Sequence, residues 1–333
     1  MTTDSEPKAK ILLLGPGSIG AVYLFQLQQA GAHVTAVCRS NYDVVSQHGF
    51  QLTSLRYGDQ QYKPHRTVRS IDECDDETFD FVLICTKSFP GAQPSLADIL
   101  APALTNRPNT AIVLAQNGIN IEQDLATAYP ANPLLSGIVY CPAVQTAPGH
   151  IAYREMLNLL ELGTFPADAP APHKAAADRF AQLMRAGGGG AAHHADIQVA
   201  RWSKLLMNAA WNPICALSLC TDGGFLQTST PYAHELAWGI MLEVVALAGA
   251  VGVEGVTEAV AREKMAIAVK RAETGTGREM SMLQDVRLGR DFEVEAIVGN
   301  AVRLGREKGV GMVRLETVYA LLKARQVALE AQR

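Results

Sequence analysis

Charge is scarce in this sequence, and the two signs are nearly balanced. Only 19% of the 333 residues are charged, and the formal net charge is -4. A chain with so little excess charge has no electrostatic reason to bind nucleic acid or a membrane surface. Hydrophobic residues make up 48% of the sequence, which is enough to bury a sizeable core. We therefore expect small molecules as partners, or a second copy of the chain in a homodimer.

Paired cysteines and targeting segments are also missing. The six cysteines include no C-x-x-C pair, so we expect neither a disulfide framework nor a metal site. Residues 1–10 are polar and of mixed charge, and they resemble neither a secretory signal nor a mitochondrial presequence. The most apolar stretch, residues 236–251, is interrupted by Glu243 and is short for a membrane span. These absences favour a cytoplasmic protein.

Length and patterning together predict two domains. In the first half of the chain, apolar runs typical of strands alternate with helical stretches. The expected strands cover residues 11–14, 33–38, 79–85, 110–115 and 134–139. Such alternation predicts an α/β domain in residues 1–194, with a mainly parallel, doubly wound sheet of the Rossmann type. A hairpin at residues 143–146 and 150–153 is expected to extend one edge of this sheet.

Residues 195–333 have a different pattern and contain no convincing strand. Apolar residues recur there at helical spacing in several long segments. These segments cover residues 196–220, 231–251, 256–273, 292–308 and 314–330. The second domain should therefore be all-helical. A shorter helix, at residues 173–186, and a glycine run, at residues 187–190, are expected to close the first domain.

The first expected strand leads directly into a glycine-rich turn, and a helical stretch follows. The turn reads Gly15-Pro16-Gly17-Ser18-Ile19-Gly20, which has the G-x-G-x-x-G form of dinucleotide-binding turns. In such turns the first glycine permits the bend, the second lets the backbone approach a pyrophosphate, and the third allows close helix packing. The helix start then offers its N–H groups to the phosphates. We expect a dinucleotide site that includes Gly15, Gly17, Ser18, Ile19 and Gly20.

The end of the second expected strand should recognise the adenosine ribose. Arg39 stands there, and an arginine can pair with the 2′-phosphate of NADP, whereas NAD would favour an acidic residue. NADP is therefore the expected cofactor, although a solvated loop arginine would give the same pattern. Two later strand ends, at Lys87 and Asn117, point toward the same crevice. From the pattern alone, these residues could equally be a surface lysine and the start of an Asn-Gly turn.

The second domain carries a polar stripe on an otherwise apolar helix. Lys204, Asn208 and Asn212 recur at every fourth position and so lie on one helical face. Burial of an ammonium and two amides without partners would be costly, which indicates a ligand or a polar cleft, with a solvent-exposed stripe as the alternative. When a hydride reaches a keto carbon, negative charge grows on the carbonyl oxygen. An ammonium such as that of Lys204 can stabilise this charge and donate a proton.

Taken in order, these motifs resemble those of the ketopantoate reductases (2-dehydropantoate 2-reductases), over nearly the whole chain. The resemblance is carried by the glycine-rich turn, Lys87, Gln116-Asn117-Gly118, Trp202-Ser203-Lys204 with Asn208 and Asn212-Pro213, Ser281-Met282-Leu283-Gln284-Asp285, and Gly289-Arg290 with Glu293. It implies an NADPH-dependent oxidoreductase that acts on a CH–OH group. The implied reaction is reduction of 2-dehydropantoate to pantoate, a step toward pantothenate and coenzyme A.

The resemblance also implies a role for each matching residue. Lys204, as general acid, and Glu293, near the nicotinamide ribose, are the implied catalytic residues. The residues implied to hold the substrate are Asn208, Asn212 and Ser281. The residues implied to contact NADP are Arg39, Lys87, Asn117 and, more loosely, Ala143.

The sequence departs from the family pattern at Ile297-Val298-Gly299, where Ile-Asn-Gly is usual, and at two residues on the substrate side. Asp222 and Arg278 each stand where the family has an asparagine on the substrate side, and we keep both as substrate-site candidates. Their opposite charges could cancel as an ion pair, or could reshape the pocket for a different acid. A paralogous reductase of another keto acid or an imine is therefore an alternative. A non-catalytic NADP-binding regulator is a second alternative, but the intact Lys204, Ser281 and Glu293 argue against it.

Overall fold

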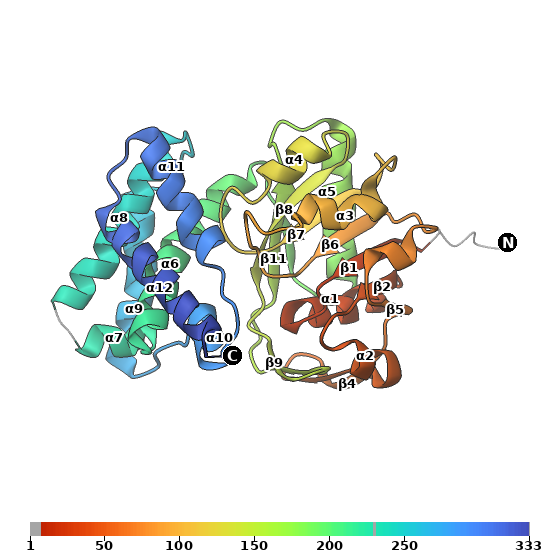
Figure 1. Cartoon of the computed structure of the whole chain (residues 1–333), viewed down its shortest axis with the longest axis horizontal. Coiled ribbons are helices and arrows are strands. Elements are labelled where there is room, and N and C mark those ends of the chain that lie inside the picture. Colours follow the sequence, from red (N-terminus) through yellow and green to blue (C-terminus); the bar gives the residue numbers. More distant parts are fainter. Residues whose placement is uncertain (1–7, 229–230, 333) are drawn as a thin grey trace. The chain divides into compact units, whose positions relative to one another are not determined.

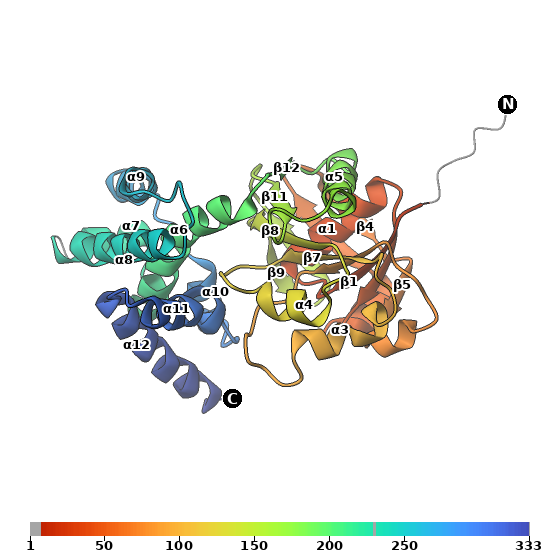
Figure 2. The same cartoon turned by 90° about the horizontal axis from the view of Figure 1, so that it is seen from above.

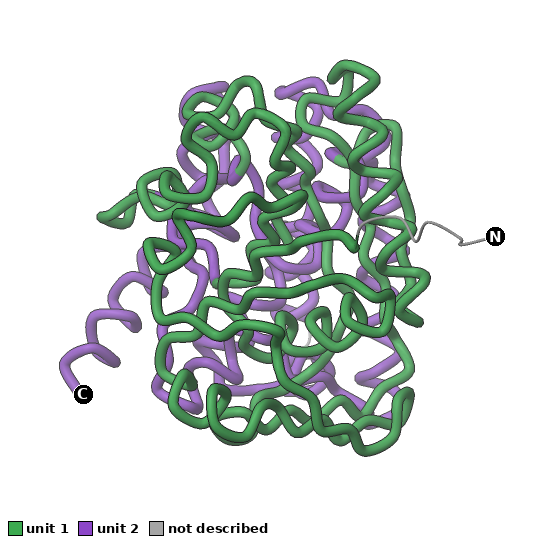
Figure 3. Tube along the Cα trace, turned by 90° about the vertical axis from the view of Figure 1, so that its right-hand side faces the viewer, with its two compact units in different colours: residues 1–86, 91–116, 122–197 green, residues 87–90, 117–121, 198–333 purple. Residues whose placement is uncertain are grey.

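The computed structural model describes residues 8–228 and 231–332, and the chain divides into two compact units. Unit 1 comprises Met1–Thr86, Gly91–Gln116 and Glu122–Ile197, and unit 2 comprises Lys87–Pro90, Asn117–Ile121 and Gln198–Arg333 (Figure 3). Two short loops that follow strands of unit 1 therefore belong to unit 2. Most of the polar start considered above, residues 1–7, lies outside the described residues.

Unit 1 is built around an eight-stranded sheet with the order β12-β11-β8-β7-β6-β1-β2-β5. Its five expected strands are present and parallel: β1 (Lys10–Leu14), β2 (His33–Val37), β6 (Phe81–Ile84), β7 (Ala111–Ala115) and β8 (Leu134–Tyr140). The edges are completed by β5 (Arg66–Val68), β11 (Leu159–Thr164) and β12 (Ala191–His193). The apolar runs of the central strands are buried because helices cover both faces. The expected Rossmann-type fold is confirmed.

The helices of unit 1 form a layer on each side of the sheet (Figures 1 and 2). One layer contains α1 (Ser18–Gln29) and α5 (Ala171–Ala186), and the other contains α3 (Leu96–Leu104) and α4 (Gln123–Ala128). A further helix, α2 (Tyr42–His48), and a 3-10 turn, Ile71–Cys74, lie in the connections. Burial of helix residues on both faces of one sheet gives unit 1 its core.

The expected hairpin forms, but it does not extend the main sheet. Its strands, β9 (Val144–Ala147) and β10 (His150–Tyr153), join β3 (Phe50–Ser54) and β4 (Gly58–Tyr62) in a separate four-stranded sheet, ordered β4-β3-β10-β9. Our prediction of its place was therefore wrong. The edge beside β8 is taken by β11, which pairs with β8 in antiparallel register. The hairpin instead buries Ile151 and Tyr153 in the core that also contains Phe50 and α1.

Unit 2 contains only helices among its described residues. They are α6 (Ile197–Ser218), α7 (Asp222–Thr228), α8 (Tyr232–Ala250), α9 (Glu258–Thr274), α10 (Ser281–Arg287), a π-helical turn (Glu295–Gly299), α11 (Asn300–Lys308) and α12 (Val313–Glu330). All five expected helical segments are present, so the helical second domain is confirmed. The pattern missed α7 and α10, because helices of 7 residues are too short to show apolar periodicity.

Helix α8 is the most apolar element of unit 2. By length and composition alone it could cross a membrane, but 50% of that stretch is buried within the protein, as in a core helix. Glu243, in the middle of this helix, is buried and has a structural role. The Glu243 carboxylate accepts hydrogen bonds from the backbone N–H groups of Arg314 and Leu315, each at 2.9 Å. Glu243 therefore caps the start of α12.

We expect Glu243→Ala to lower the free energy of unfolding by about 2 kcal/mol, because two N–H groups in the first turn of α12 lose their acceptor. Urea denaturation measures this change. Glu307→Ala is the matched control, since Glu307 is exposed and pairs only with its neighbour Lys308; it should cost less than about 0.5 kcal/mol. Equal effects of the two substitutions would contradict the capping role.

Candidate active site

The glycine-rich turn of unit 1 has the geometry that a dinucleotide requires. Gly15 has φ +84, a left-handed conformation that favours glycine. A Cβ on Gly20 would lie 2.5 Å from the Gly15 carbonyl oxygen, so close packing requires glycine there as well. A Cβ on Gly17, in contrast, would meet only the Gln145 side chain, at 3.9 Å. Protein packing does not explain the glycine at 17, and the open space over it fits a close-approaching diphosphate.

Two contacts from other segments of unit 1 hold the turn in place. The Asn41 side chain donates a hydrogen bond to the Pro16 carbonyl oxygen at 3.0 Å. The backbone N–H of Gln145, on β9, donates to Ser18 Oγ at 2.9 Å. Because Ser18 Oγ is an acceptor in this bond, its own proton can point elsewhere, for example toward a phosphate oxygen. The sheet that contains the hairpin thus helps to build the nucleotide turn.

The other nucleotide-site candidates of unit 1 lie near these elements in the chain. Ile19 is half-buried in the first turn of α1, and Ala143 is half-buried just before β9. Arg39 is exposed immediately beyond the end of β2, as expected for a residue that recognises a ribose phosphate.

The central polar feature of unit 2 is a series of hydrogen bonds that starts at Lys204 on α6. Lys204 Nζ donates to Asn117 Oδ1 at 3.0 Å, and Asn117 Nδ2 donates to Glu293 Oε2 at 3.1 Å. Glu293 Oε1 accepts from the backbone N–H of Ser88 at 2.9 Å. We call this series the Lys204 relay. It joins two expected catalytic residues with the two loops that unit 2 receives.

The chemistry of the relay fixes the direction of each amide bond. An ammonium can only donate, so Asn117 must present its oxygen to Lys204 and its NH2 group to Glu293. Burial raises the pKa of Glu293 above its ordinary value of 4.5, while the N–H groups of Ser88 and Asn117 and the charge of Lys87 oppose this shift. The neighbouring Gly118 has φ +101 and packs against the Ala296 carbonyl of the π-helical turn, which brings Asn117 close to Glu293.

Lys87, an expected cofactor ligand, has partners within unit 2. Its ammonium lies 2.6 Å from Asp285 Oδ1 and donates to the Asp291 carbonyl oxygen at 2.6 Å. Burial raises the pKa of Asp285, and the charge of Lys87 opposes that shift. A lysine held in this way is not a mobile surface group, and its position is set by α10.

The expected substrate ligands lie on α6 and α10. Asn208 is half-buried, and Asn212 is buried one turn further along α6. Asn212 Oδ1 accepts hydrogen bonds from Ser281 Oγ and from the backbone N–H of Met282, both at 3.1 Å. The structure therefore brings Asn212 and Ser281 together, although they are far apart in the sequence. Buried Asn212 and half-buried Lys204 also exclude a fully solvent-exposed stripe.

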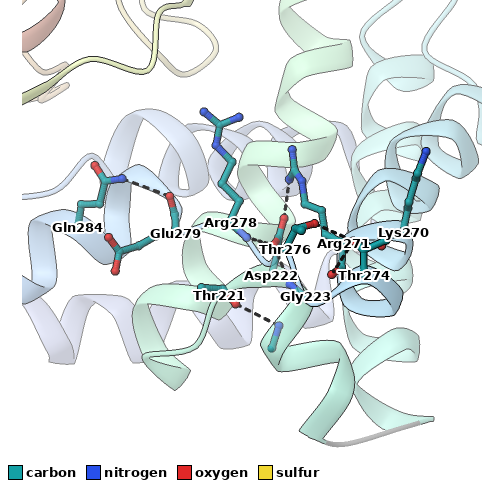
Figure 4. A network of polar contacts seen from close by, with 11 residues as sticks. Thr221, Asp222, Gly223, Lys270, Arg271, Thr274, Thr276, Arg278, Glu279 and Gln284 are labelled. Carbon is teal, nitrogen blue, oxygen red and sulfur yellow. Dashed lines mark hydrogen bonds and ion pairs between the residues drawn. The ribbon is translucent and has the colours of Figure 1, made fainter. Parts of the chain in front are cut away.

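Asp222 and Arg278 do not form the ion pair that their charges suggested. Asp222 is fully buried, and its Oδ2 lies 2.6 Å from the guanidinium of Arg271 on α9. Asp222 Oδ1 accepts from the backbone N–H groups of Gly223 and Arg278, at 2.7 and 2.6 Å. Figure 4 shows the Arg278 side chain directed away from Asp222. Asp222 therefore contacts Arg278 only through the main chain.

Comparison with known proteins identifies the family. The profile described as "Ketopantoate reductase PanE/ApbA" matches residues 11–167, and its C-terminal counterpart, "Ketopantoate reductase PanE/ApbA C terminal", matches residues 196–326. The chain belongs to the ketopantoate reductase family. A 2-dehydropantoate 2-reductase of Nostoc sp. is 27% identical, covering 94% of each chain. An uncharacterised protein of Saccharomyces cerevisiae is 26% identical, covering 98% of this chain and 96% of that protein.

Solved structures agree with this assignment. The crystal structure of a 2-dehydropantoate 2-reductase from Methylococcus capsulatus matches with a TM-score of 0.83 and 33% identity, covering 96% of this chain and 97% of that one. A D-mandelate dehydrogenase solved with NADH shares the fold, with a TM-score of 0.81 at 21% identity over 96% and 99% of the two chains. The Nostoc relative is named as a 2-dehydropantoate 2-reductase, which is an oxidoreductase.

Several site residues of this ketopantoate reductase family member were missed from the sequence. They are Asn41, Ser88, Arg271 and Asp285. Asp285 lies in a motif that carried the family resemblance, so a signal existed for it. Ser88 acts through its backbone, and Arg271 is on an ordinary helical surface pattern, so neither gives a sequence signal. The six cysteines are free, and no group of metal-ligating residues was found in the described part of the chain.

The raised pKa of Glu293 predicts a pH effect on stability. Because the folded-state pKa exceeds the ordinary value of 4.5, the native state binds this proton more tightly than the unfolded state. The contribution to stability is therefore present below pH 4.5 and is lost as the pH rises through the folded-state pKa. As the pH rises from about 4 to 8, the free energy of unfolding of the wild type should therefore fall relative to that of Glu293→Gln, which cannot titrate. Urea denaturation of both proteins from about pH 4 to pH 8 measures the difference. A difference that is constant, or that shifts in favour of the wild type with rising pH, would contradict the assignment.

Proposed function

We propose that this protein reduces 2-dehydropantoate to pantoate with NADPH, in the pathway to pantothenate and coenzyme A. The observation on which the proposal rests is the Lys204 relay, in which Asn117 and the buried Glu293 support a half-buried ammonium. A lysine that only faced solvent on a helix surface would not need hydrogen-bonded partners of this kind. The relay provides what a keto acid reductase needs, a positioned cation that can also donate a proton.

A bound reduced nicotinamide would supply the hydride that adds to the keto carbon. Lys204 then stabilises the negative charge on the keto oxygen and donates the proton that completes the hydroxyl group. Asn117 fixes the position of the ammonium, and Glu293 fixes the direction of the Asn117 amide. The keto acid, NADPH and one proton are consumed, and the hydroxy acid and NADP+ are formed.

Substrate binding is assigned to Asn208, Asn212 and Ser281. Their amides and hydroxyl can donate to a carboxylate and can exchange hydrogen bonds with a substrate hydroxyl. Asn212 and Ser281 are already hydrogen-bonded to each other, so their mutual position does not have to be organised by the substrate. We place them opposite the carboxylate end of the keto acid.

A second candidate is the reduction of a different 2-keto acid. Asp222 pairs with Arg271, so the expected ion pair between Asp222 and Arg278 does not account for these two departures from the family pattern. NADPH consumption over a panel of branched and dicarboxylic 2-keto acids decides between the candidates. The first holds if 2-dehydropantoate has the highest kcat/KM, and the second holds if another acid exceeds it by about tenfold or more.

We also propose that the protein is a cytoplasmic homodimer. A ketopantoate reductase of Staphylococcus aureus with the same fold, at 23% identity, is described as dimeric. The nearly balanced charge gives no electrostatic reason for membrane binding, which supports a cytoplasmic location. Sedimentation of the purified protein tests the dimer.

NADPH should be strongly preferred over NADH because Arg39, at the end of β2, can pair with the 2′-phosphate. Arg39→Ala should reduce the ratio of kcat/KM for NADPH to that for NADH by roughly 10- to 100-fold. Arg185→Ala removes the same charge from an exposed helix position in unit 1 and should leave the ratio unchanged. Equal kcat/KM values for both cofactors in the wild type would refute the NADP assignment.

Lys204→Ala should lower kcat by about 10²–10⁴, because it removes both the proton donor and the charge opposite the developing alkoxide. NADPH affinity should change far less than kcat, since the glycine-rich turn and Arg39 lie in unit 1 and the Asn117 amide keeps its bond to Glu293. Steady-state kinetics, NADPH titration and circular dichroism separate a catalytic defect from misfolding. Lys270→Ala, an exposed lysine of the same unit, is the charge-matched control. If Lys204→Ala kept kcat within about threefold of wild type, the mechanism would need another acid.

A further inference from the structure

The segment between α9 and α10 leads to one of the proposed substrate ligands, Ser281. Its course is fixed at two points. At one point the backbone of Arg278 forms two hydrogen bonds with Asp222: Arg278 N donates to Asp222 Oδ1 at 2.6 Å, and Asp222 N donates to the Arg278 carbonyl at 3.2 Å. At the other point Ser281 Oγ and Met282 N donate to Asn212. Only two residues separate Arg278 from Ser281, so the first contact directly limits where Ser281 can lie.

The junction around Asp222 is tightly packed, which makes this contact specific. A Cβ on Gly277 would lie 2.3 Å from Thr221 Oγ1, and a Cβ on Gly223 would lie 3.0 Å from the Cα of Gly277. Figure 4 shows Asp222 between the Arg271 side chain and the main chain at Arg278. The backbone of the segment therefore passes directly over the start of α7.

The carboxylate of Asp222 is engaged by groups of the protein itself and is closed off from solvent. It is fully buried, one oxygen lies against Arg271, and the other accepts two backbone N–H groups. Arg271 compensates the charge of this buried acid, whose burial without a partner would be costly. A carboxylate in this setting organises the protein, whereas a substrate-site amide would face the ligand.

We propose that Asp222 is a positioning residue, which holds the main chain at Arg278 and so places Ser281 against Asn212 for substrate binding. Arg271 serves to hold the Asp222 carboxylate in its orientation. The inference rests on the proposed function in one respect, that Ser281 and Asn212 bind the keto acid. The other part of the inference, that Asp222 holds the main chain at Arg278 in place, does not depend on any substrate.

The test is a double-mutant cycle of Asp222→Asn and Arg271→Met. In Asp222→Asn the new NH2 group must face either Arg271 or the backbone N–H groups, so one set of donors loses its acceptor. If Arg271 becomes methionine in addition, the Asn oxygen can serve the backbone N–H groups without opposing the guanidinium. Arg271→Met alone keeps the backbone contacts while it leaves the acid uncompensated.

Each of the three variants has an expected result in steady-state kinetics and thermal unfolding. Asp222→Asn should raise KM for the keto acid about tenfold, with kcat and NADPH affinity within about threefold of wild type. The double variant should return KM to within about threefold of wild type. Arg271→Met should lower the melting temperature more than it changes KM. If KM follows the melting temperature in all three variants, or if the double variant is not rescued, Asp222 is not a positioning residue.

Hydrogen exchange provides the readout that needs no substrate. Peptides that cover residues 276–283 should exchange slowly in the wild type, about tenfold faster in Asp222→Asn, and slowly again in the double variant. Unchanged exchange in Asp222→Asn would overturn the inference even if the kinetics agreed. If the exchange results are as expected but the wild type reduces no keto acid, the proposed function fails while the hold on the segment stands.

Discussion

A buried carboxylate must be surrounded by donors, and the arrangement of unit 2 depends on this constraint at Glu293. Its two oxygens need N–H groups, and these come from Ser88 and Asn117, about 200 positions earlier in the sequence. Once Asn117 donates to Glu293, its oxygen is directed at Lys204. One buried acid therefore determines where a lysine on another helix lies, without touching it.

Two further buried carboxylates in the described part of unit 2 accept main-chain N–H groups in the same way. Asp222 holds the backbone at Gly223 and Arg278, and Glu243 holds the first turn of α12. In each case a carboxylate accepts main-chain N–H groups that the local helix leaves without an intrahelical partner or that a loop presents. The helices of unit 2 supply the apolar core. The three acids fix where the main chain lies at helix starts and in the connecting segments.

Periodicity was enough to predict both folds, and the sequence motif was enough to locate the glycine-rich turn, because these features depend on short stretches of chain. The place of the hairpin was not predicted, because its partner strand β3 was not recognised. β3 alternates apolar and polar residues, so a signal existed for it, whereas β4, the next strand in that sheet, is largely polar. The Lys204, Asn208 and Asn212 stripe was visible, but its partners were not. The pairing of Asp222 with Arg271 joins α7 to α9 across 49 positions, and charge alone favoured Arg278 equally. Such choices are made by tertiary packing.

The two loops that unit 2 receives, Lys87–Pro90 and Asn117–Ile121, have a consequence for how this architecture can be recombined. A helical domain exchanged between relatives at a single junction near residue 197 would leave its Asn117 and Ser88 behind. The transplanted Glu293 would then meet a foreign pair of loops, and a mismatch there would leave a buried anion without donors. In evolutionary terms the two halves are not independent modules, since the loops must be inherited with the helices that they contact.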